Sequence, residues 1–369
     1  MKIKSLLIGS AAIMGGVSAA QAADMVVVPE PEPMEYVRVC DVYGAGFFYI
    51  PGTETCLKIG GMVRYQMGFS NGDFGDSDGW RKYARAEVNI DARSETEYGT
   101  LGAFIKLRGH TTREDTLIAP GLNEGGAHSQ GVDGYFRLQQ AIISLGGLSL
   151  GISDSIWDTG LSGEQDVGFF PYDRVHFVNY TFDAANGVSF AVSLEEADDD
   201  YDYTPNVVGR VGVAQGWGSA DLYAAYDATG EEYAVKGIVK ANLSDRMWLG
   251  VLGQYESGIG YYSVNPFDDI GSTGLSFHTG AEWSAAAELG YKFTPKLKAS
   301  LGGSYYSEVG HGVVLSDVDA WKVGTTIDYA IVQNFNAKLA VNYTKFDGIV
   351  DGIEDPHQWS GFLRLQRDF

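Results

Sequence analysis

The feature that most constrains this chain is an alternation of polar and apolar residues that recurs from residue 57 to the C-terminus. Between Trp80 and Arg93, the even-numbered positions are mainly alanine, valine and isoleucine, whereas the odd-numbered positions are mainly arginine, glutamate, asparagine and aspartate. Successive side chains of a β-strand point to opposite faces of the sheet, so this segment has one apolar face and one ionic face. Such a strand suits the boundary between an apolar environment and water.

Sixteen runs of roughly ten residues show this alternation, and a turn or loop separates each run from the next. An even number of strands is what a closed antiparallel barrel requires if both of its ends lie on one side. A soluble propeller or β-helix would also tolerate the 49 glycines and the many aromatic residues, but the four-strand period of propeller blades is absent from the sequence. The runs begin near residues 57, 80, 99, 133, 148, 175, 187, 206, 217, 232, 246, 281, 296, 320, 335 and 357.

The connections between the runs alternate in length. One set is short, as in "SETEYG" and "NLSD", and the other is mostly long and acidic, as in "EEADDDYDYT" and "SEVGHGVVLSDVD". This asymmetry, together with aromatic residues at the ends of the runs, is typical of outer-membrane barrels. We therefore predict an all-β, transmembrane antiparallel β-barrel of sixteen strands with short periplasmic turns and long extracellular loops. The aromatic residues assigned to the lipid boundary are Trp80, Trp217, Trp248, Trp283, Trp321, Trp359 and Phe369.

The first residues predict export. A basic start, an apolar run and the small-residue pattern Ala20-Gln21-Ala22 indicate a secretory signal peptide at residues 1–22. The alternative, a short membrane anchor, is disfavoured because the apolar run is shorter than the roughly 20 residues that a spanning helix needs. The formal net charge of −22 also disfavours nucleic-acid binding, since a surface that binds phosphates should be basic.

Residues 23–56 are expected to form a periplasmic N-terminal extension, followed by the transmembrane barrel at residues 57–369. The extension contains the only two cysteines, Cys40 and Cys56. In an oxidising compartment we predict that they form one disulfide, and the alternative is two free thiols.

Charged residues of two kinds are predicted to line the lumen. Basic residues on the polar faces of the first three runs form one wall, and the connection at residues 156–174 has carboxylates and glycines that let it fold sharply. We expect this loop to fold inward, to narrow the lumen and to set up a field across it. The alternative is that these charges are scattered and solvated. The basic residues are Arg64, Arg81, Arg85, Lys106 and Arg108, and the acidic residues are Asp158, Glu164, Asp166 and Asp173.

Three segments resemble the general porins of alphaproteobacteria: "EYVRVCDVYGAGFFYIPGTETCLKIGGMVRYQ", "GVSFAVSLE" and the closing "FLRLQRDF". The resemblance covers essentially the whole mature chain. It implies a homotrimer of sixteen-stranded barrels in the outer membrane of a Gram-negative bacterium, in contact with lipid and lipopolysaccharide. Each barrel would pass small hydrophilic solutes and ions by passive diffusion, with the third extracellular loop folded into the pore. The terminal Phe369 matches the signal that the barrel-assembly machinery recognises.

No signature of catalysis accompanies these features. HExxH, Walker A and GxSxG sequences are absent, and the six histidines show no ligand spacing. We therefore expect neither an enzyme, nor a cofactor, nor a metal site. An outer-membrane hydrolase is disfavoured because no strand offers a serine and a histidine in alternation. An adhesin or a structural envelope protein, whose long loops bind partners, is the remaining alternative.

Overall fold

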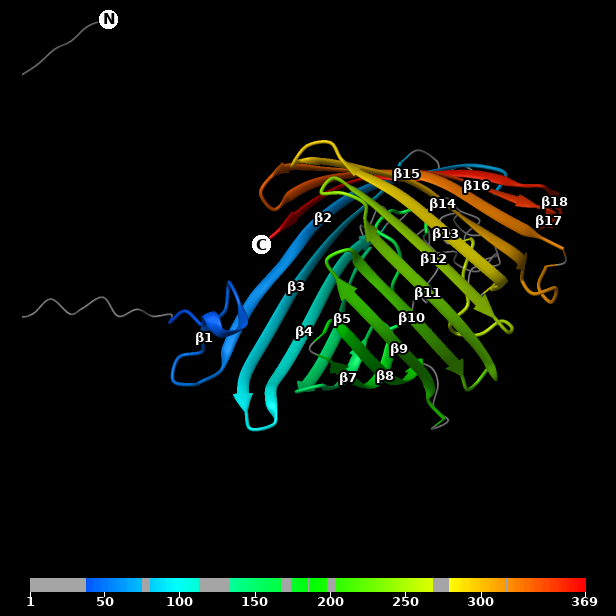
Figure 1. The fold of residues 1–369 in the computed structure, drawn as a ribbon. Coiled ribbons are helices and arrows are strands. Elements are labelled where there is room, and N and C mark those ends of the chain that lie inside the picture. Colours follow the sequence, from blue (N-terminus) through cyan, green and yellow to red (C-terminus); the bar gives the residue numbers. More distant parts are fainter. Residues whose placement is uncertain are drawn as a thin grey trace, which may run out of the picture. The chain divides into compact units, whose positions relative to one another are not determined.

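Sixteen antiparallel strands close into a barrel in the computed structural model of this chain (Figure 1). The structure describes residues 38–74, 80–112, 133–166, 174–184, 186–197, 204–267, 279–315 and 317–369. The first eight strands are β2 (Cys56–Gly72), β3 (Arg81–Thr96), β4 (Gly99–Thr112), β5 (Asp133–Leu145), β6 (Leu148–Ser153), β7 (Val175–Asp183), β8 (Val188–Ala197) and β9 (Asn206–Gln215). The other eight are β10 (Gly218–Asp227), β11 (Glu232–Asn242), β12 (Met247–Glu256), β13 (Ala281–Lys292), β14 (Leu297–Val309), β15 (Asp319–Val332), β16 (Phe335–Asp347) and β19 (His357–Asp368).

The strands form a simple meander. Each pairs with the next along the chain, and the last strand, β19, pairs with the first, β2, which closes the ring. The predicted sixteen-stranded barrel is therefore confirmed, and every predicted run coincides with one strand. Closure satisfies the backbone hydrogen bonds of both edges, as a barrel in lipid requires.

Short turns and long loops lie at opposite ends of the barrel. The short turns and the C-terminus are at the left in Figure 1, and the longer loops are at the right. The turn between β5 and β6 consists of two glycines, and Gly146 has a φ of 55°, which suits a two-residue hairpin turn. With an exported chain, the turn end faces the periplasm and the loop end faces outward.

Four small elements lie outside the ring. They are the 3-10 helix η1 (Asp41–Tyr43) and the strands β1 (Phe48–Tyr49), β17 (Ile349–Val350) and β18 (Ile353–Glu354). The predicted disulfide is present and joins Cys40 to Cys56, the first residue of β2. The predicted signal peptide lies outside the described residues. In the described part of the chain, no helix is long and apolar enough to cross a membrane.

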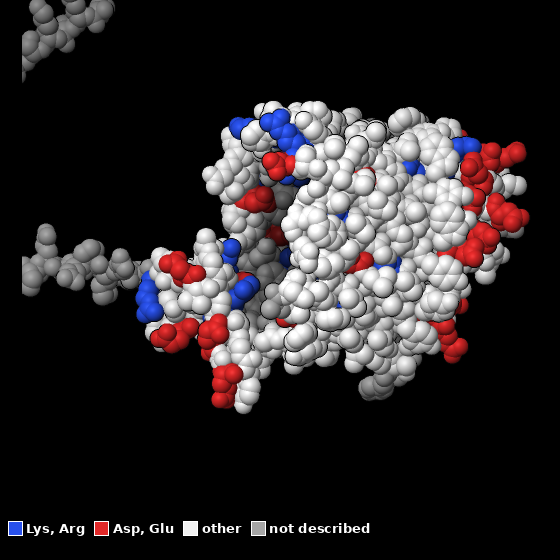
Figure 2. Space-filling model, viewed as in Figure 1, with Lys and Arg blue, Asp and Glu red and all other residues white. Residues whose placement is uncertain are grey.

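The outer surface of the barrel is apolar between two rows of aromatic side chains. Figure 2 shows a largely uncharged outer wall and a gathering of acidic side chains at the loop end. Near the loops, the ring of Tyr343 lies 4.9 Å from that of Trp359 and 5.4 Å from that of Trp321. Near the turns, Tyr180, Trp217, Tyr291 and Tyr329 are exposed. This surface matches the lipid-facing band and aromatic girdles of an outer-membrane barrel.

Candidate functional site

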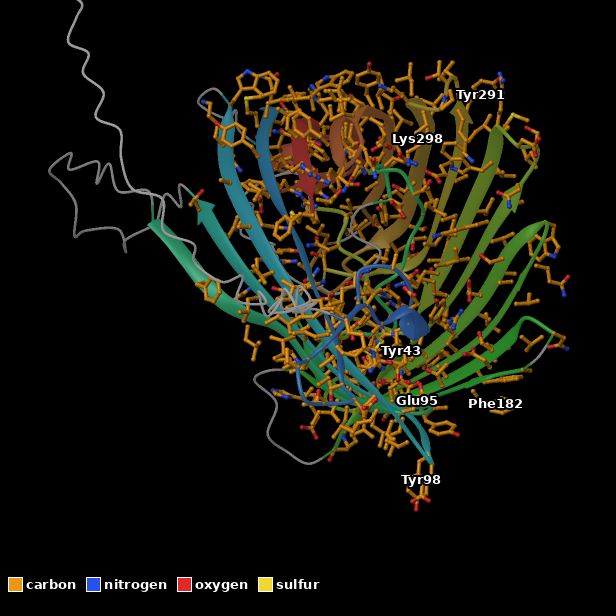
Figure 3. The ribbon with its side chains drawn as sticks, turned by 90° about the vertical axis from the view of Figure 1, so that its left-hand side faces the viewer. Tyr43, Glu95, Tyr98, Phe182, Tyr291 and Lys298 are labelled. Carbon is orange, nitrogen blue, oxygen red and sulfur yellow. A yellow bond between two sulfur atoms is a disulfide. The ribbon has the colours of Figure 1, made fainter. Side chains whose placement is uncertain are left out.

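The first part of the loop between β6 and β7, residues 154–166, lies inside the barrel, and we call it the inner loop. Its Trp157 is fully buried and packs edge-on against Tyr223 of β10. The buried Nζ of Lys236, on β11, donates hydrogen bonds to the carbonyl oxygens of Trp157 (2.6 Å) and Thr159 (3.1 Å). Figure 3, which views the barrel from the turn end, shows this green segment within the lumen. The predicted inward fold of the third loop is thus confirmed.

A buried carboxylate on β13, Glu288, holds the middle of this segment. It accepts hydrogen bonds from the backbone N of Ser162 (3.1 Å), from the hydroxyl of Ser162 and from Nε2 of Gln165 (3.0 Å). Nε1 of Trp248, on β12, also donates to Glu288 (3.0 Å). A buried carboxylate with several donors is satisfied electrostatically, so it fixes the loop at one position.

The direction of Trp248 corrects one sequence expectation. Trp248 was assigned to the lipid boundary, but its indole points into the lumen and donates to Ser162 as well as to Glu288. Small residues make this arrangement possible, because a Cβ on Gly290 would lie 1.9 Å from the Trp248 ring. Trp248 therefore positions the inner loop and takes no part in the aromatic girdle.

A second buried carboxylate, Glu195 on β8, joins the inner loop to another loop. It accepts hydrogen bonds from the hydroxyl of Ser155 (2.6 Å), the backbone N of Ile156 (3.2 Å) and the hydroxyl of Tyr262 (3.1 Å). Tyr262 belongs to the loop between β12 and β13, and its ring lies 5.5 Å from that of Trp157. Two loops therefore share one anchor inside the barrel.

The loop between β12 and β13 reaches β16 through Phe267. The ring of Phe267 stacks on that of Phe346, on β16, with 4.5 Å between centroids, and Phe74 meets both rings edge-on. Residues 257–267 thus pack with residues 154–166 along the β8–β16 side of the lumen. Sequence reasoning missed this second inner loop, although the aromatic residues in "YYSVNPF" are unusual for a solvated loop.

The end of the inner loop carries the charge contact that defines the constriction. Oε1 of Glu164 lies 2.9 Å from Nζ of Lys338, on β16, and 3.5 Å from Nη1 of Arg364, on β19. Burial alone would raise the pKa of Glu164, but the nearby charges of Lys338, Arg364 and Arg64 together lower it. Glu164 is therefore ionised at neutral pH. Its backbone N donates a hydrogen bond to the hydroxyl of Thr326, and its carbonyl oxygen accepts one from Nδ2 of Asn342, so its position is fixed.

The other predicted loop carboxylates that the structure describes, Asp158 and Asp166, do not make such contacts. Asp166 turns back on its own loop and accepts a hydrogen bond from the backbone N of Leu161. Burial raises the pKa of Asp166 to about 6, and burial with the nearby Asp154 raises the pKa of Asp158 to about 6. Asp173 lies outside the described residues. Of the described loop carboxylates named from the sequence, Glu164 is the one that forms an ion pair with the barrel wall.

A row of cationic residues crosses the neighbouring strands on the inner face. Arg64 of β2 lies directly opposite Arg85 of β3, and Nε of Arg85 has no hydrogen-bond partner in the described part of the protein. Arg108 of β4 pairs with Glu87 at 2.6 Å. Like charges in direct register repel one another, so this row requires water or anions in front of it.

Two of the five predicted basic residues lie away from this row. The strand register places Lys106 opposite Asn89 rather than opposite Arg85, and Arg81 is exposed at the loop end of β3. Sequence reasoning also missed Lys236 and Lys338, although Lys338 occupies a polar position in the alternation of "FNAKLAVNYTKFD". The loop partners of these lysines are distant in sequence, which is why the alternation alone did not identify them.

The N-terminal segment folds against the inner face of the barrel at the turn end. The hydroxyl of Tyr43 donates to Oε1 of Glu95, on β3, at 2.8 Å (Figure 3). The guanidinium of Arg93 lies 5.3 Å from the ring centroid of Phe47, and Arg93 also pairs with Asp91 at 2.7 Å. Residues 38–55 therefore narrow the periplasmic mouth on the β2–β3 side.

The arrangement supports electrostatic selection. An anchored loop narrows the lumen, a glutamate meets two cations, and a row of arginines continues along the wall. Within the described ranges, no group of three or more histidine, cysteine, aspartate or glutamate side chains is placed to hold a metal ion.

The sequence is similar to those of known porins. The family model described as "Porin subfamily" matches residues 24–362. The chain is 37% identical to Porin Omp2a of Brucella melitensis biotype 1 over 388 residues, and 36% identical to Porin Omp2b of Brucella canis over 397 residues. Each alignment covers 100% of both chains.

Solved structures resemble the fold. The outer membrane channel DcaP of Acinetobacter baumannii superimposes with a TM-score of 0.61 and 14% identity, covering 87% of this chain and 99% of that one. A mutant of the Rh. blastica porin superimposes with a TM-score of 0.52 and 15% identity, covering 85% of this chain and 100% of that one. At this level of identity the likeness concerns the barrel architecture.

Proposed function

The chain belongs to the Porin subfamily, and on that premise we propose that the contact between its inner loop and its basic wall selects the solutes that pass. It is a channel of the Gram-negative outer membrane that works by passive diffusion. The observation that supports the proposal is the contact of Glu164 with Lys338 and Arg364, next to the row that begins at Arg64. A fixed field of this kind orients polar solutes, whereas apolar solutes must give up ordered water.

The predicted basic wall takes two roles in this proposal. Arg64, Arg85 and Arg108 line the constriction, because they form or adjoin the cationic row on the inner face. Arg81 lies at the outer mouth and Lys106 below the row, where they contribute to the approach of solutes. We expect no catalytic activity, since diffusion through a channel needs only a water-filled lumen and the electric field of the charges that line it.

We further propose that three barrels associate. The outward residues of β3 and β4 are mainly alanine, valine, leucine and isoleucine, with no aromatic side chain among them. Elsewhere on the outer wall, aromatic residues mark the lipid boundary. Exposed aromatic residues flank this sector at its ends, at Trp80 before β3 and at Tyr98 in the following turn. An apolar sector whose strands have no such residues suits contact with a second copy better than contact with lipid.

Export and assembly complete the proposal. Residues 1–22 act as the signal peptide, residues 23–56 form the periplasmic extension, and the barrel follows. Phe369, whose backbone exchanges two 3.0 Å hydrogen bonds with Gly61 at the turn end, is the residue that the assembly machinery would recognise. Lipopolysaccharide would contact the loop end of the outer wall.

Recording from a planar bilayer tests the channel and its oligomeric state together. The purified mature chain should produce conductance steps in groups of three in potassium chloride. Single independent steps would contradict the trimer but support the channel. A silent membrane would contradict the channel and favour an adhesin or a structural barrel.

A further inference from the structure

A cavity of about 500 Å³ opens on the inner wall at the turn end of the barrel. Side chains from β2, β13, β14, β15, β16 and β19 line it, together with the turn between β13 and β14. In Figure 3, Lys298 lies on the inner side of this rim and Tyr291 on the outer side. The cavity is therefore part of the lumen, on the periplasmic side of the inner loop.

Cationic side chains dominate the lining of this cavity. Six of them, Arg64, Lys292, Lys296, Lys298, Lys338 and Arg364, face a single lining carboxylate, Asp328. Asp328 is shared, at 3.6 Å from Lys298 and 3.7 Å from Lys338. Glu164, at the constriction, is shared between Lys338 and Arg364. Even with Glu164 counted, the cations outnumber the carboxylates, in a chain whose formal net charge is −22.

The strand register brings like charges together along this wall. Lys292 lies directly opposite Lys298, and Lys338 lies directly opposite Arg364. Asp328 occupies the position between the two pairs. Like charges in direct cross-strand register are destabilising unless a counter-charge relieves them. Glu164 relieves the pair of Lys338 and Arg364, which leaves Asp328 as the one lining carboxylate for Lys292, Lys296 and Lys298. The wall is thus built to hold an additional anion.

We propose that this cavity binds small oxyanionic solutes, whose shared chemistry is a carboxylate or phosphate group. Lysine and arginine bind such groups through charge-assisted hydrogen bonds, and Asn336 and Gln366 add neutral polar groups to the lining. The volume lies within the range of about 300–1,000 Å³ that is common for small-molecule sites. The site rests on the proposed function, because an anion from outside the cell reaches it through the constriction, whereas an anion on the periplasmic side reaches it directly.

The position of the cavity also gives it a role in transport. Arg64, Lys338 and Arg364 belong both to the constriction and to the cavity lining. An anion that passes Glu164 is therefore received by the cavity without leaving the cationic wall. Because the cavity is open to water, binding is weak and reversible, as flux through a channel requires.

Single-channel recording with inorganic phosphate tests this inference. Phosphate at pH 7.5 should reduce the potassium chloride current reversibly, and more strongly when it is added on the periplasmic side. The double variant Lys292→Gln/Lys298→Gln should raise the half-blocking concentration about tenfold, because it removes two charges from the site. Succinate should behave as phosphate does, since both are small oxyanions that are mainly dianionic at pH 7.5.

Lys240→Gln is the matched control, because Lys240 is a lysine near the turn end of β11 that does not line the cavity. It should leave the half-blocking concentration unchanged. An equal half-blocking concentration in the double variant and the unmodified protein would overturn the inference, as would block that is equally strong from both sides. If the unmodified protein gave no potassium chloride current at all, that result would instead contradict the proposed function. The sidedness measurement needs no variant, so it holds even if the double variant assembles poorly.

Discussion

Glu164 of the inner loop and Lys338 of β16 are joined by an ion pair of 2.9 Å, although 174 residues separate them in the chain. The same carboxylate reaches Arg364, on the strand that closes the barrel against β2. One side chain therefore connects the loop to the wall where the ring closes. Removal of its charge should change both the field in the lumen and the mobility of the loop.

We expect Glu164→Gln to shift the channel toward anions. A unit charge about 8 Å from a passing ion is worth about 0.5 kcal/mol in water, so the cation-to-anion permeability ratio should fall about two- to fivefold. The reversal potential in a salt gradient measures this ratio. Glu354→Gln, at an exposed residue of β18, is the control and should leave the ratio nearly unchanged. An unaltered reversal potential in Glu164→Gln would show that ions pass elsewhere.

The opposite change is expected from the cationic row. Arg64→Ala combined with Arg85→Ala should shift the reversal potential toward cations and raise the conductance, because it removes two charges and widens the opening. Both residues face the lumen, and their repulsion in register contributes no stability. Circular dichroism in detergent should therefore show an intact barrel. Unchanged currents would show that these two arginines do not line the constriction.

The anchor at Glu288 offers a test of loop position. Glu288→Ala removes the acceptor of bonds from Ser162, Gln165 and Trp248 and should release the inner loop. Each hydrogen bond to a charged group contributes about 1.5–3 kcal/mol, so we expect a noisier open current and a larger conductance. Glu282→Ala, at a residue of β13 that is not among the anchors of the inner loop, is the control. A quiet channel of ordinary conductance would mean that the loop is held without Glu288.

The barrel could be predicted from the sequence because successive positions of every strand face lipid and water in turn, so apolar and polar residues alternate. In β3, Arg85 and Ala86 follow this rule, and the inward fold of the third loop was expected from its glycines and carboxylates. The partners of that loop were not predictable, because Lys338 and Glu288 meet it only after the ring has closed. Trp248 shows most clearly where prediction from the residue type alone fails. Its residue type indicated the lipid boundary, whereas its place in the alternation, on the side of Gly250 and Leu252, indicated the lumen.

The disulfide should stabilise the periplasmic mouth locally. Cys40 and Cys56 are 16 residues apart, and a loop of that size corresponds to about 3 kcal/mol in the chain-entropy account. Cys40→Ser/Cys56→Ser should leave the barrel intact but make trypsin cleave faster after Arg38, as measured by mass spectrometry. Tyr43→Phe, which removes only the bond to Glu95, should have a smaller effect. Equal cleavage rates in all three proteins would contradict a structural role for the disulfide.

Acidification should shift the ion selectivity toward anions, because burial raises the pKa of two inner-loop carboxylates, Asp158 and Asp166, to about 6. Burial raises the pKa of Asp158 and of Asp166 to about 6, so both are charged at pH 7.5 and mostly neutral at pH 5. Loss of two negative charges beside the lumen should move the reversal potential toward anions over that interval. The pKa values are raised in the folded state, so protonation also stabilises the loop, and this stabilisation is lost as the pH rises through 6. Asp158→Asn/Asp166→Asn should remove the step between pH 7.5 and 5, whereas Glu164→Gln should retain it, because the nearby cations lower the pKa of Glu164. A step of the same size in the double variant would assign the titration to other groups.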